Sequence, residues 1–220
     1  GVVYLCGCTR AVIGGAGSGP HGPPDRYPGT CRRLSAAERA ARDRSGRPAA
    51  LRIRTDEASV PFTDRHHGAV VLQADDAVVR RGDGTHGYHL ATVVDDHDQG
   101  VTEVVRGDDL LPSSAVQLWL IERLGLRRPE YAHVPLVLGP AGRRLAKRDG
   151  AVTLADRRAL GESPEDVLGL LAASVGLWPR DRAATADALL GAYDPATFAP
   201  PPAGPLEDLT GTADSVARDG

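Results

Sequence analysis

Short runs of β-branched and other apolar residues recur through the first two thirds of the chain, separated by Gly, Asp and Pro. Such runs, bounded by turn-forming residues, are typical of strands in a sheet. They predict strands at VVYLC (2–6), ALRIR (50–54), AVVL (69–72), AVVR (77–80), LATVV (90–94), VTEVV (101–105) and HVPLVL (133–138).

Three other segments predict helices. Residues 34–46 are rich in alanine, with a serine placed to cap the start and a glycine placed to end the helix. Residues 113–125 put apolar side chains on adjoining turns, with Ser113 or Ser114 as the cap. Residues 163–176 open with Ser-Pro followed by acidic residues. Strands followed by helices predict an α/β core with a helical C-terminal end.

Length and charge narrow the classes of function. A chain of 220 residues, 41% apolar and 25% charged, suits one globular domain or one domain with an appendage. Its net charge of -3 argues against nonspecific polyanion binding, so contact with nucleic acid requires a local patch. No apolar run is long enough to cross a bilayer, and the N-terminus lacks the pattern of a signal peptide. We therefore expect a cytoplasmic protein.

The composition has two unusual features. The chain contains no methionine and begins with Gly1 directly in an apolar run, which predicts that it is part of a longer protein. Its basic residues are 25 arginines and a single lysine, Lys147. Because arginine serves here wherever a generic positive charge suffices, Lys147 is a candidate for a position that specifically requires an ammonium group.

The three cysteines, Cys6, Cys8 and Cys31, are candidate metal ligands. A disulfide across Cys-x-Cys closes a small, strained ring, and disulfides are rare in cytoplasmic proteins. Zinc takes about four N, S or O ligands, so a fourth donor is needed, and Tyr27 and His21 are the local candidates. Four protein ligands leave no open position, which predicts a structural site. Unrelated buried thiols are the alternative interpretation.

A basic, glycine-rich loop follows the last predicted strand. Residues 136–152 contain Arg143, Arg144, Lys147 and Arg148 after a Gly-Pro turn. Such a loop is able to wrap a polyphosphate and neutralise the charge of a departing pyrophosphate. A solvated surface turn is the alternative, and the unique lysine favours the phosphate-binding interpretation.

Three motifs, in order along the chain, resemble one family. RRLAKR after HVPLVLGPAG resembles the KMSKS-type signature loop of class I aminoacyl-tRNA synthetases, in the form used by the glutamyl group. GYHLATVVDDHDQGVTEVVRGDDLL (87–111) resembles the glutamate-site segment of that group. CGC and YPGTC resemble the zinc subdomain of the glutamyl-queuosine tRNA(Asp) branch. This resemblance implies Zn²⁺ bound by Cys6, Cys8, Tyr27 and Cys31.

The resemblance also implies an activity and its site residues. The family activates L-glutamate with ATP and Mg²⁺, and this branch transfers the glutamyl group to the queuosine base in the anticodon of tRNA(Asp). It implies that Tyr88 and Arg106 bind glutamate, that Lys147 is catalytic at the ATP phosphates, and that Arg144 and Arg148 assist in binding ATP. A planar guanidinium suits a carboxylate substrate. By the same resemblance we expect a monomer.

The implied fold is the Rossmann-like catalytic core of a class I synthetase, incomplete at its N-terminus, with a small zinc-binding insertion. The expected regions are a zinc-binding subdomain (1–35), the remainder of the core (36–155), a helical C-terminal subdomain (156–198) and a disordered tail (199–220). The HIGH-type motif that holds ATP is absent from these residues. We therefore expect this chain by itself to be inactive.

Two departures and two alternatives accompany the resemblance. Arg144 and Ala146 stand where the signature has lysine and serine. The first alternative is a fragment of a conventional glutamyl-tRNA synthetase, although few residues follow Lys147 for an anticodon-binding domain. The second is a noncatalytic, zinc-stabilised tRNA-binding remnant. His89 and His133 cannot be assigned a carboxylate partner from sequence alone.

Overall fold

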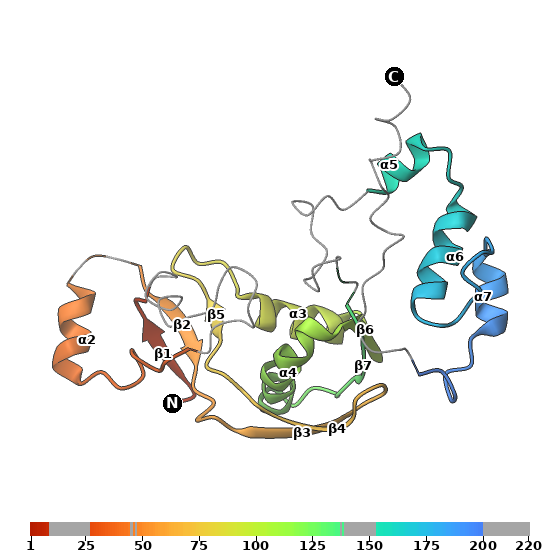
Figure 1. Ribbon diagram of the computed structural model, residues 1–220. Helices are drawn as coiled ribbons and strands as arrows, with labels where there is room; N and C mark the ends of the chain where they lie inside the picture. Colours follow the sequence, from red (N-terminus) through yellow and green to blue (C-terminus); the bar gives the residue numbers. More distant parts are fainter. Residues whose placement is uncertain (9–26, 45, 47, 137, 139–152, 200–220) are drawn as a thin grey trace. The chain divides into compact units, whose positions relative to one another are not determined.

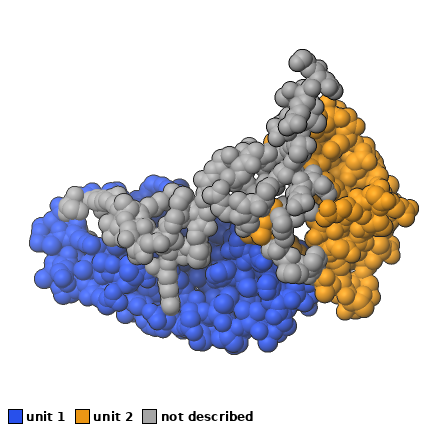
Figure 2. Space-filling view, viewed as in Figure 1, with its two compact units in different colours: residues 1–133 blue, residues 134–220 orange. Residues whose placement is uncertain are grey.

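The computed structural model describes residues 1–8, 27–44, 46, 48–136, 138 and 153–199. The candidate ligand His21, the basic loop with Lys147 and nearly all of the tail lie outside the described residues. The chain divides into two compact units, residues 1–133 and 134–220, which Figure 2 shows in separate colours.

A small antiparallel sheet carries the N-terminal segment of the first unit (Figure 1). It consists of β1 (Val3–Cys6), β2 (Ala50–Ile53) and β5 (Val78–Arg80), in the order β1-β2-β5. Tyr4 in β1 lies opposite Arg52 in β2. In the sequence, β1 and β2 are separated by α2 (Ala36–Asp43), which begins with a capping box between Ser35 and Glu38.

A second, mixed sheet has the order β4-β3-β7-β6. Its strands are β3 (Ser59–Asp64), β4 (Gly68–Gln73), β6 (Glu103–Gly107) and β7 (Glu130–Val134). β3 and β4 form an antiparallel hairpin, whereas β3 runs parallel to β7 and meets it at the pair Asp64 and Tyr131. This pairing places the end of β3 beside β7, although the two strands are far apart in sequence.

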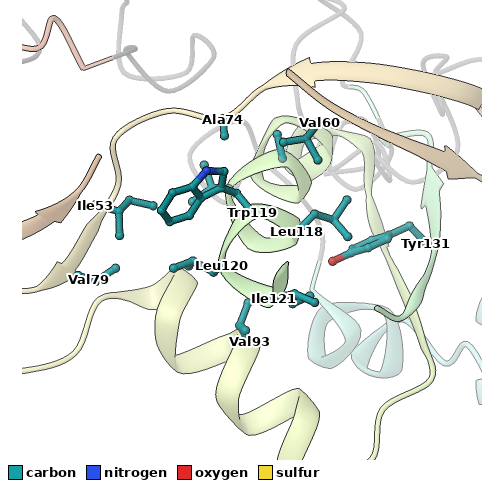
Figure 3. Close-up of a cluster of buried hydrophobic side chains, with 12 residues drawn as sticks. Ile53, Val60, Ala74, Val79, Val93, Leu118, Trp119, Leu120, Ile121 and Tyr131 are labelled. Atoms are coloured by element: carbon teal, nitrogen blue, oxygen red, sulfur yellow. The ribbon is translucent and has the colours of Figure 1, made fainter. Parts of the chain in front are cut away.

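Two helices cover the core of the first unit. They are α3 (Tyr88–Asp98) and α4 (Leu111–Leu124), the latter preceded by the short 3-10 helix η1 (Asp108–Leu110). Residues 114–121 of α4 are all buried. Figure 3 shows Leu118, Trp119, Leu120 and Ile121 of this helix among side chains from strands and α3. The cluster comprises Ile53, Val60, Ala74, Val79, Val93, Ala115, Val116, Leu118, Trp119, Leu120, Ile121 and Tyr131.

The second unit is helical in its described part. It contains α5 (Leu154–Ala159), α6 (Pro164–Ser174) and α7 (Ala186–Ala192), each with a Ser or Thr side chain capping its N-terminus. Ser163 and Pro164 start α6 as the sequence predicts. Throughout the described part of the chain, no helix has the length and apolar character needed to span a membrane.

The α/β prediction is confirmed, but the predicted strand at 90–94 is wrong because these residues lie within α3. Leu90 and Val93 are one helical turn apart and both pack against the core cluster, whereas Val94 is exposed. Burial of one helix face outweighs the β-propensity of the Val-Val pair.

The predicted start of α4 is also wrong. The helix begins at Leu111, with Pro112 in its first turn, where a missing N–H costs nothing. Ser113 and Ser114 therefore lie inside the helix, and Ser114 is fully buried instead of capping. The helix ends, as predicted, at Gly125, whose φ of 68° is left-handed.

Two strand assignments need correction. The strand predicted at 133–138 is β7, which starts earlier and ends before Pro135. β3 has no counterpart in the prediction, because Pro61 weakens the strand signal of its sequence. Pro61 has no N–H to donate. It is tolerated because this part of β3 pairs with β4 alone, since β7 meets β3 only at Asp64.

Candidate functional site

Arg106 occupies the carboxyl end of β6, and two neutral acceptors hold its guanidinium. Its Nε donates to His133 Nε2 at 3.0 Å, and its Nη2 donates to Ser114 Oγ at 2.8 Å. No carboxylate among the described residues forms an ion pair with Arg106. A guanidinium has five N–H donors, so the contacts with described residues leave its positive charge and most of its donors for another anion.

The imidazole of His133 is buried between Arg106 and a carboxylate. His133 Nδ1 lies 2.6 Å from Asp64 Oδ2, and both side chains are fully buried. Because the guanidinium always donates, Nε2 must accept, and the proton is therefore on Nδ1, facing Asp64. Burial and the positive charge of Arg106 lower the pKa of His133, against the opposing effect of Asp64, and keep the ring neutral.

Backbone donors keep Asp64 ionised. Burial favours its neutral form, but the hydrogen bond from the His133 ring and the backbone N–H groups of His66 and His67 outweigh that effect and lower its pKa. The two backbone bonds are each 3.0 Å long and come from the turn that follows β3. The N–H groups of the turn between β3 and β4 thus stabilise the negative charge of the Asp64 carboxylate.

Asp64, His133 and Ser114 have the order of a hydrolase triad, but they cannot act as one. Ser114 Oγ is 3.3 Å from His133 Nε2, yet the same nitrogen accepts from Arg106 and so cannot take the serine proton. Ser114 is also inaccessible, with no exposed surface. The group is therefore a support for the arginine.

Tyr131 adds an aromatic surface beside this network. Its ring stacks on His133 with centroids 5.8 Å apart and planes 10° apart, and the guanidinium carbon of Arg106 lies 5.5 Å from its centroid. Figure 3 shows the Tyr131 ring projecting from its strand toward the core side chains of α4. The hydrogen bonds to His133 and Ser114 thus fix the Arg106 guanidinium, and its positive charge lies over the Tyr131 ring.

The start of α3 carries a second pair of rings, of which His89 interacts electrostatically with Arg106. Tyr88 is the first helical residue, 58% exposed, and its ring makes an edge contact with His89 at 5.4 Å. Burial, followed by the charge of Arg106, lowers the pKa of His89. His89 Nδ1 is buried without a hydrogen-bond partner in the described part of the chain. Tyr88 and Arg106 form no direct hydrogen bond with each other there.

The three cysteines converge on one point, with Tyr27 beside them. Their sulfur atoms lie within 4.8 Å of one another, and Cys8 Sγ is 3.4 Å from Cys31 Sγ. Tyr27 Oη is 3.5 Å from Cys6 Sγ and 3.9 Å from Cys8 Sγ. A tetrahedral zinc ion places thiolate sulfurs about 3.8 Å apart and a phenolate oxygen about 3.5 Å from each sulfur. The Cys8–Cys31 and Tyr27–Cys6 distances are close to these values, and all three sulfur atoms lie within 4.8 Å of one another, so the donor set fits a tetrahedral ion.

Two arginines face the sulfur atoms. Arg42 donates to Cys31 Sγ at 2.6 Å, and Arg52 Nε donates to Cys6 Sγ at 3.3 Å while its guanidinium lies 4.0 Å from the Tyr27 ring centroid. Burial opposes ionisation of Cys6, but its hydrogen bonds, including the one from Arg52, lower its pKa to about 7, whereas burial raises the pKa of Cys8. Burial and the hydrogen bond with Cys6 raise the pKa of Tyr27, so a phenolate at this position requires a bound cation.

Two adjacent carboxylates connect the cysteine cluster to the small sheet. The backbone N–H of Tyr27 donates to Asp75 at 2.8 Å, and the Tyr4 hydroxyl donates to Asp76 at 2.7 Å. Asp76 also pairs with Arg32 at 3.3 Å and accepts from the backbone and side chain of Thr55. The loop that carries Tyr27 is therefore fixed to the segment just before β5.

The fold and the site define an α/β protein with an exposed tyrosine and an arginine that pairs with no carboxylate in the described part of the chain, an arrangement suited to an anionic substrate. Residues 4–177 match the family model described as tRNA synthetases class I (E and Q), catalytic domain. The chain belongs to this family.

Two curated relatives are glutamyl-Q tRNA(Asp) synthetases. That of Nocardia farcinica is 56% identical over 196 residues, 89% of this chain, and that of Symbiobacterium thermophilum is 45% identical over 200 residues, 88% of this chain. The chain spans 62% of the length of each. Among solved structures, a glutamate-tRNA synthetase from Elizabethkingia anophelis aligns with a TM-score of 0.69 at 25% identity, covering 92% of this chain and 47% of the other.

The structure thus brings together the four predicted metal ligands, and it places Tyr88 at the start of α3 and Arg106 near the end of β6. Lys147, Arg144 and Arg148 lie outside the described residues, so their predicted roles stay predictions. The sequence did not predict that Ser114 and His133 bind the Arg106 guanidinium, or that Asp64 binds His133. Only the unassigned His133 gave a signal, and its carboxylate partner lies 69 residues away in the chain.

Proposed function

We propose that the protein activates L-glutamate with ATP and transfers the glutamyl group to the queuosine base of tRNA(Asp). In the first step a glutamate carboxylate oxygen attacks the α-phosphorus of ATP, an acyl-phosphate bond forms and pyrophosphate leaves. In the second step the glutamyl group passes to the modified base and AMP leaves. The observation that carries the proposal is the Arg106 guanidinium, which the described residues hold through the neutral acceptors His133 and Ser114 and not through a carboxylate.

The residues divide between the two substrates. Arg106 binds a carboxylate of glutamate, and the exposed Tyr88 at the start of α3 orients the same molecule. Lys147, assisted by Arg144 and Arg148, neutralises the ATP phosphates with Mg²⁺. The names of the curated relatives support tRNA(Asp) carrying queuosine as the acceptor.

The cysteine cluster binds a structural Zn²⁺ through Cys6, Cys8, Tyr27 and Cys31. Three thiolates favour zinc over harder cations, and four protein ligands leave no position for substrate. The ion organises residues 1–35 as a subdomain, while Arg42 and Arg52 compensate the negative charge of its ligands.

Glutamate-dependent exchange of pyrophosphate into ATP tests the first step, with protein expressed from its complete reading frame. We expect exchange with glutamate and its loss, by about tenfold or more, in Arg106→Gln, because the substituted amide lacks the charge that pairs with a carboxylate. Arg123→Gln is the matched control, since Arg123 lies over Trp119 at the far end of α4. Absence of exchange in the wild type would overturn the proposal.

A conventional glutamyl-tRNA synthetase is the second candidate, favoured by the structural match to the Elizabethkingia anophelis enzyme. The two candidates differ in their acceptor. Labelled glutamate should be transferred to tRNA(Asp) that contains queuosine, and neither to unmodified tRNA(Asp) nor to tRNA(Glu). Transfer to tRNA(Glu) would select the second candidate.

A further inference from the structure

We infer that Asp64, His133 and Ser114 are positioning residues, which hold the Nε/Nη2 edge of the Arg106 guanidinium and direct its adjacent Nη1/Nη2 edge toward the carboxylate of the amino-acid substrate. The identity of the substrate rests on the proposed function. The grip itself rests on the contacts among these four side chains.

The two hydrogen bonds use one edge of the guanidinium and leave another free. Nε and Nη2 lie along the same side of the group, and they donate to His133 and Ser114 respectively. The end formed by Nη1 and Nη2 keeps the parallel pair of N–H groups that binds a carboxylate in bidentate fashion. A side chain fixed at Nε and Nη2 has no freedom to rotate that pair away from its target.

Neutral acceptors preserve the charge of Arg106. A carboxylate at the position of His133 Nε2 would pair directly with the guanidinium and compete with an anionic substrate. Here the negative charge of Asp64 is one imidazole further away and reaches Arg106 only through the ring. That charge makes Nε2 a better acceptor, as an outer carboxylate does for a metal-bound histidine.

The ring of His133 is itself held in one orientation. Its backbone N–H donates to Asp64 at 3.1 Å, its Nδ1 lies 2.6 Å from the same carboxylate oxygen, and Tyr131 stacks on one face. The grip is thus built from a strand end, a second strand and the helix that follows β6. Such supports place a binding group within the tolerance that recognition requires.

Two substitutions of His133 separate the acceptor from the donor. In His133→Gln the amide oxygen reaches the position of Nε2 and still accepts from Arg106. In His133→Asn the shorter amide reaches the position of Nδ1, donates to Asp64, and leaves Arg106 Nε without an acceptor. We expect the KM for glutamate in the exchange reaction to rise about tenfold or more in His133→Asn, and much less in His133→Gln. The KM for ATP should not change in either variant.

Ser114→Ala provides a milder test that keeps the ring intact. We expect it to raise the KM for glutamate as well, whereas Thr55→Val, which removes another buried hydroxyl, one that bonds to Ala74 and Asp76, should not. Equal KM values for glutamate in the wild type, His133→Asn and Ser114→Ala would overturn the inference. An equal rise in His133→Asn and His133→Gln would also overturn it, because a general loss of packing affects both.

A measurement independent of activity tests the grip alone. In ¹⁵N NMR spectra of the wild-type chain at neutral pH, His133 should show the tautomer protonated at Nδ1. Protonation at Nε2, or at both nitrogens, would refute the contact with Arg106. If the wild type lacks glutamate-dependent exchange but shows this tautomer, the proposed function fails while the grip stands.

Discussion

The buried imidazole of His133 makes stability depend on pH. It faces the Asp64 carboxylate, the Arg106 guanidinium and, at longer range, His67. Burial lowers its pKa from the ordinary 6.5, and the pKa of His89 is lowered in the same direction and for the same first reason. Both histidines therefore bind protons more readily in the unfolded chain.

We predict that the free energy of unfolding is greatest above pH 6.5 and falls as the pH drops below that value. In this window the unfolded state holds protons that the folded state excludes, so stability decreases by up to about 1.4 kcal/mol per pH unit for each histidine. Urea unfolding between pH 7.5 and pH 5 measures the slope. The slope should be shallower in His133→Gln, and a wild type that gains stability on acidification would contradict the prediction.

At the scale of elements, the start of α3 depends on Gly87. Its backbone passes so close to β5 that an added Cβ would lie 1.9 Å from the Val78 carbonyl oxygen. The N–H of Gly87 also donates to the Val79 carbonyl at 2.9 Å. The glycine thus allows Tyr88 and His89 to begin a helix directly against a strand.

We predict that Gly87→Ala lowers the free energy of unfolding by about 1–3 kcal/mol and raises the KM for glutamate, because the methyl group forces the start of α3 away from β5. Gly191→Ala in α7 is the matched control. Nothing lies within 4 Å of the added Cβ at this position, and replacing glycine by alanine inside a helix improves helix propensity by about 1 kcal/mol. Urea unfolding and exchange kinetics measure both effects, and equal stability of Gly87→Ala and wild type would contradict the close contact.

The sequence predicted correctly those helix ends that are determined by capping residues close to them in the chain. Ser163 with Pro164 starts α6 and Gly125 ends α4, since caps act through the nearest backbone groups. The run at 90–94 misled because core packing decided its conformation. In the site, motif resemblance pointed to Arg106, but its contact with His133 arises from sheet order, which short-range patterns do not encode.

At the scale of the whole molecule, the cysteine cluster and the small sheet form one connected region. Cys6 ends β1, Arg52 of β2 contacts its sulfur, and the carboxylates of Asp75 and Asp76 fix Tyr27 and Tyr4. The helices of the second unit form a separate compact body. Loss of an ion from the cluster should therefore act first on the strands of the first unit.

We predict that a zinc chelator strips protection from hydrogen exchange in β1 and β2 while the amides of α6 keep theirs. Without the ion, no metal–ligand bond draws the three sulfur atoms to one point, and the loop carrying Tyr27 loses one anchor while its hydrogen bond to Asp75 remains. Tyr27→Phe should weaken zinc retention and reproduce part of this loss. Tyr4→Phe is its control, since that hydroxyl bonds to Asp76 and to no sulfur. Added Zn²⁺ should restore protection, and unchanged exchange in β1 and β2 after chelation would show that the cluster holds no structural metal.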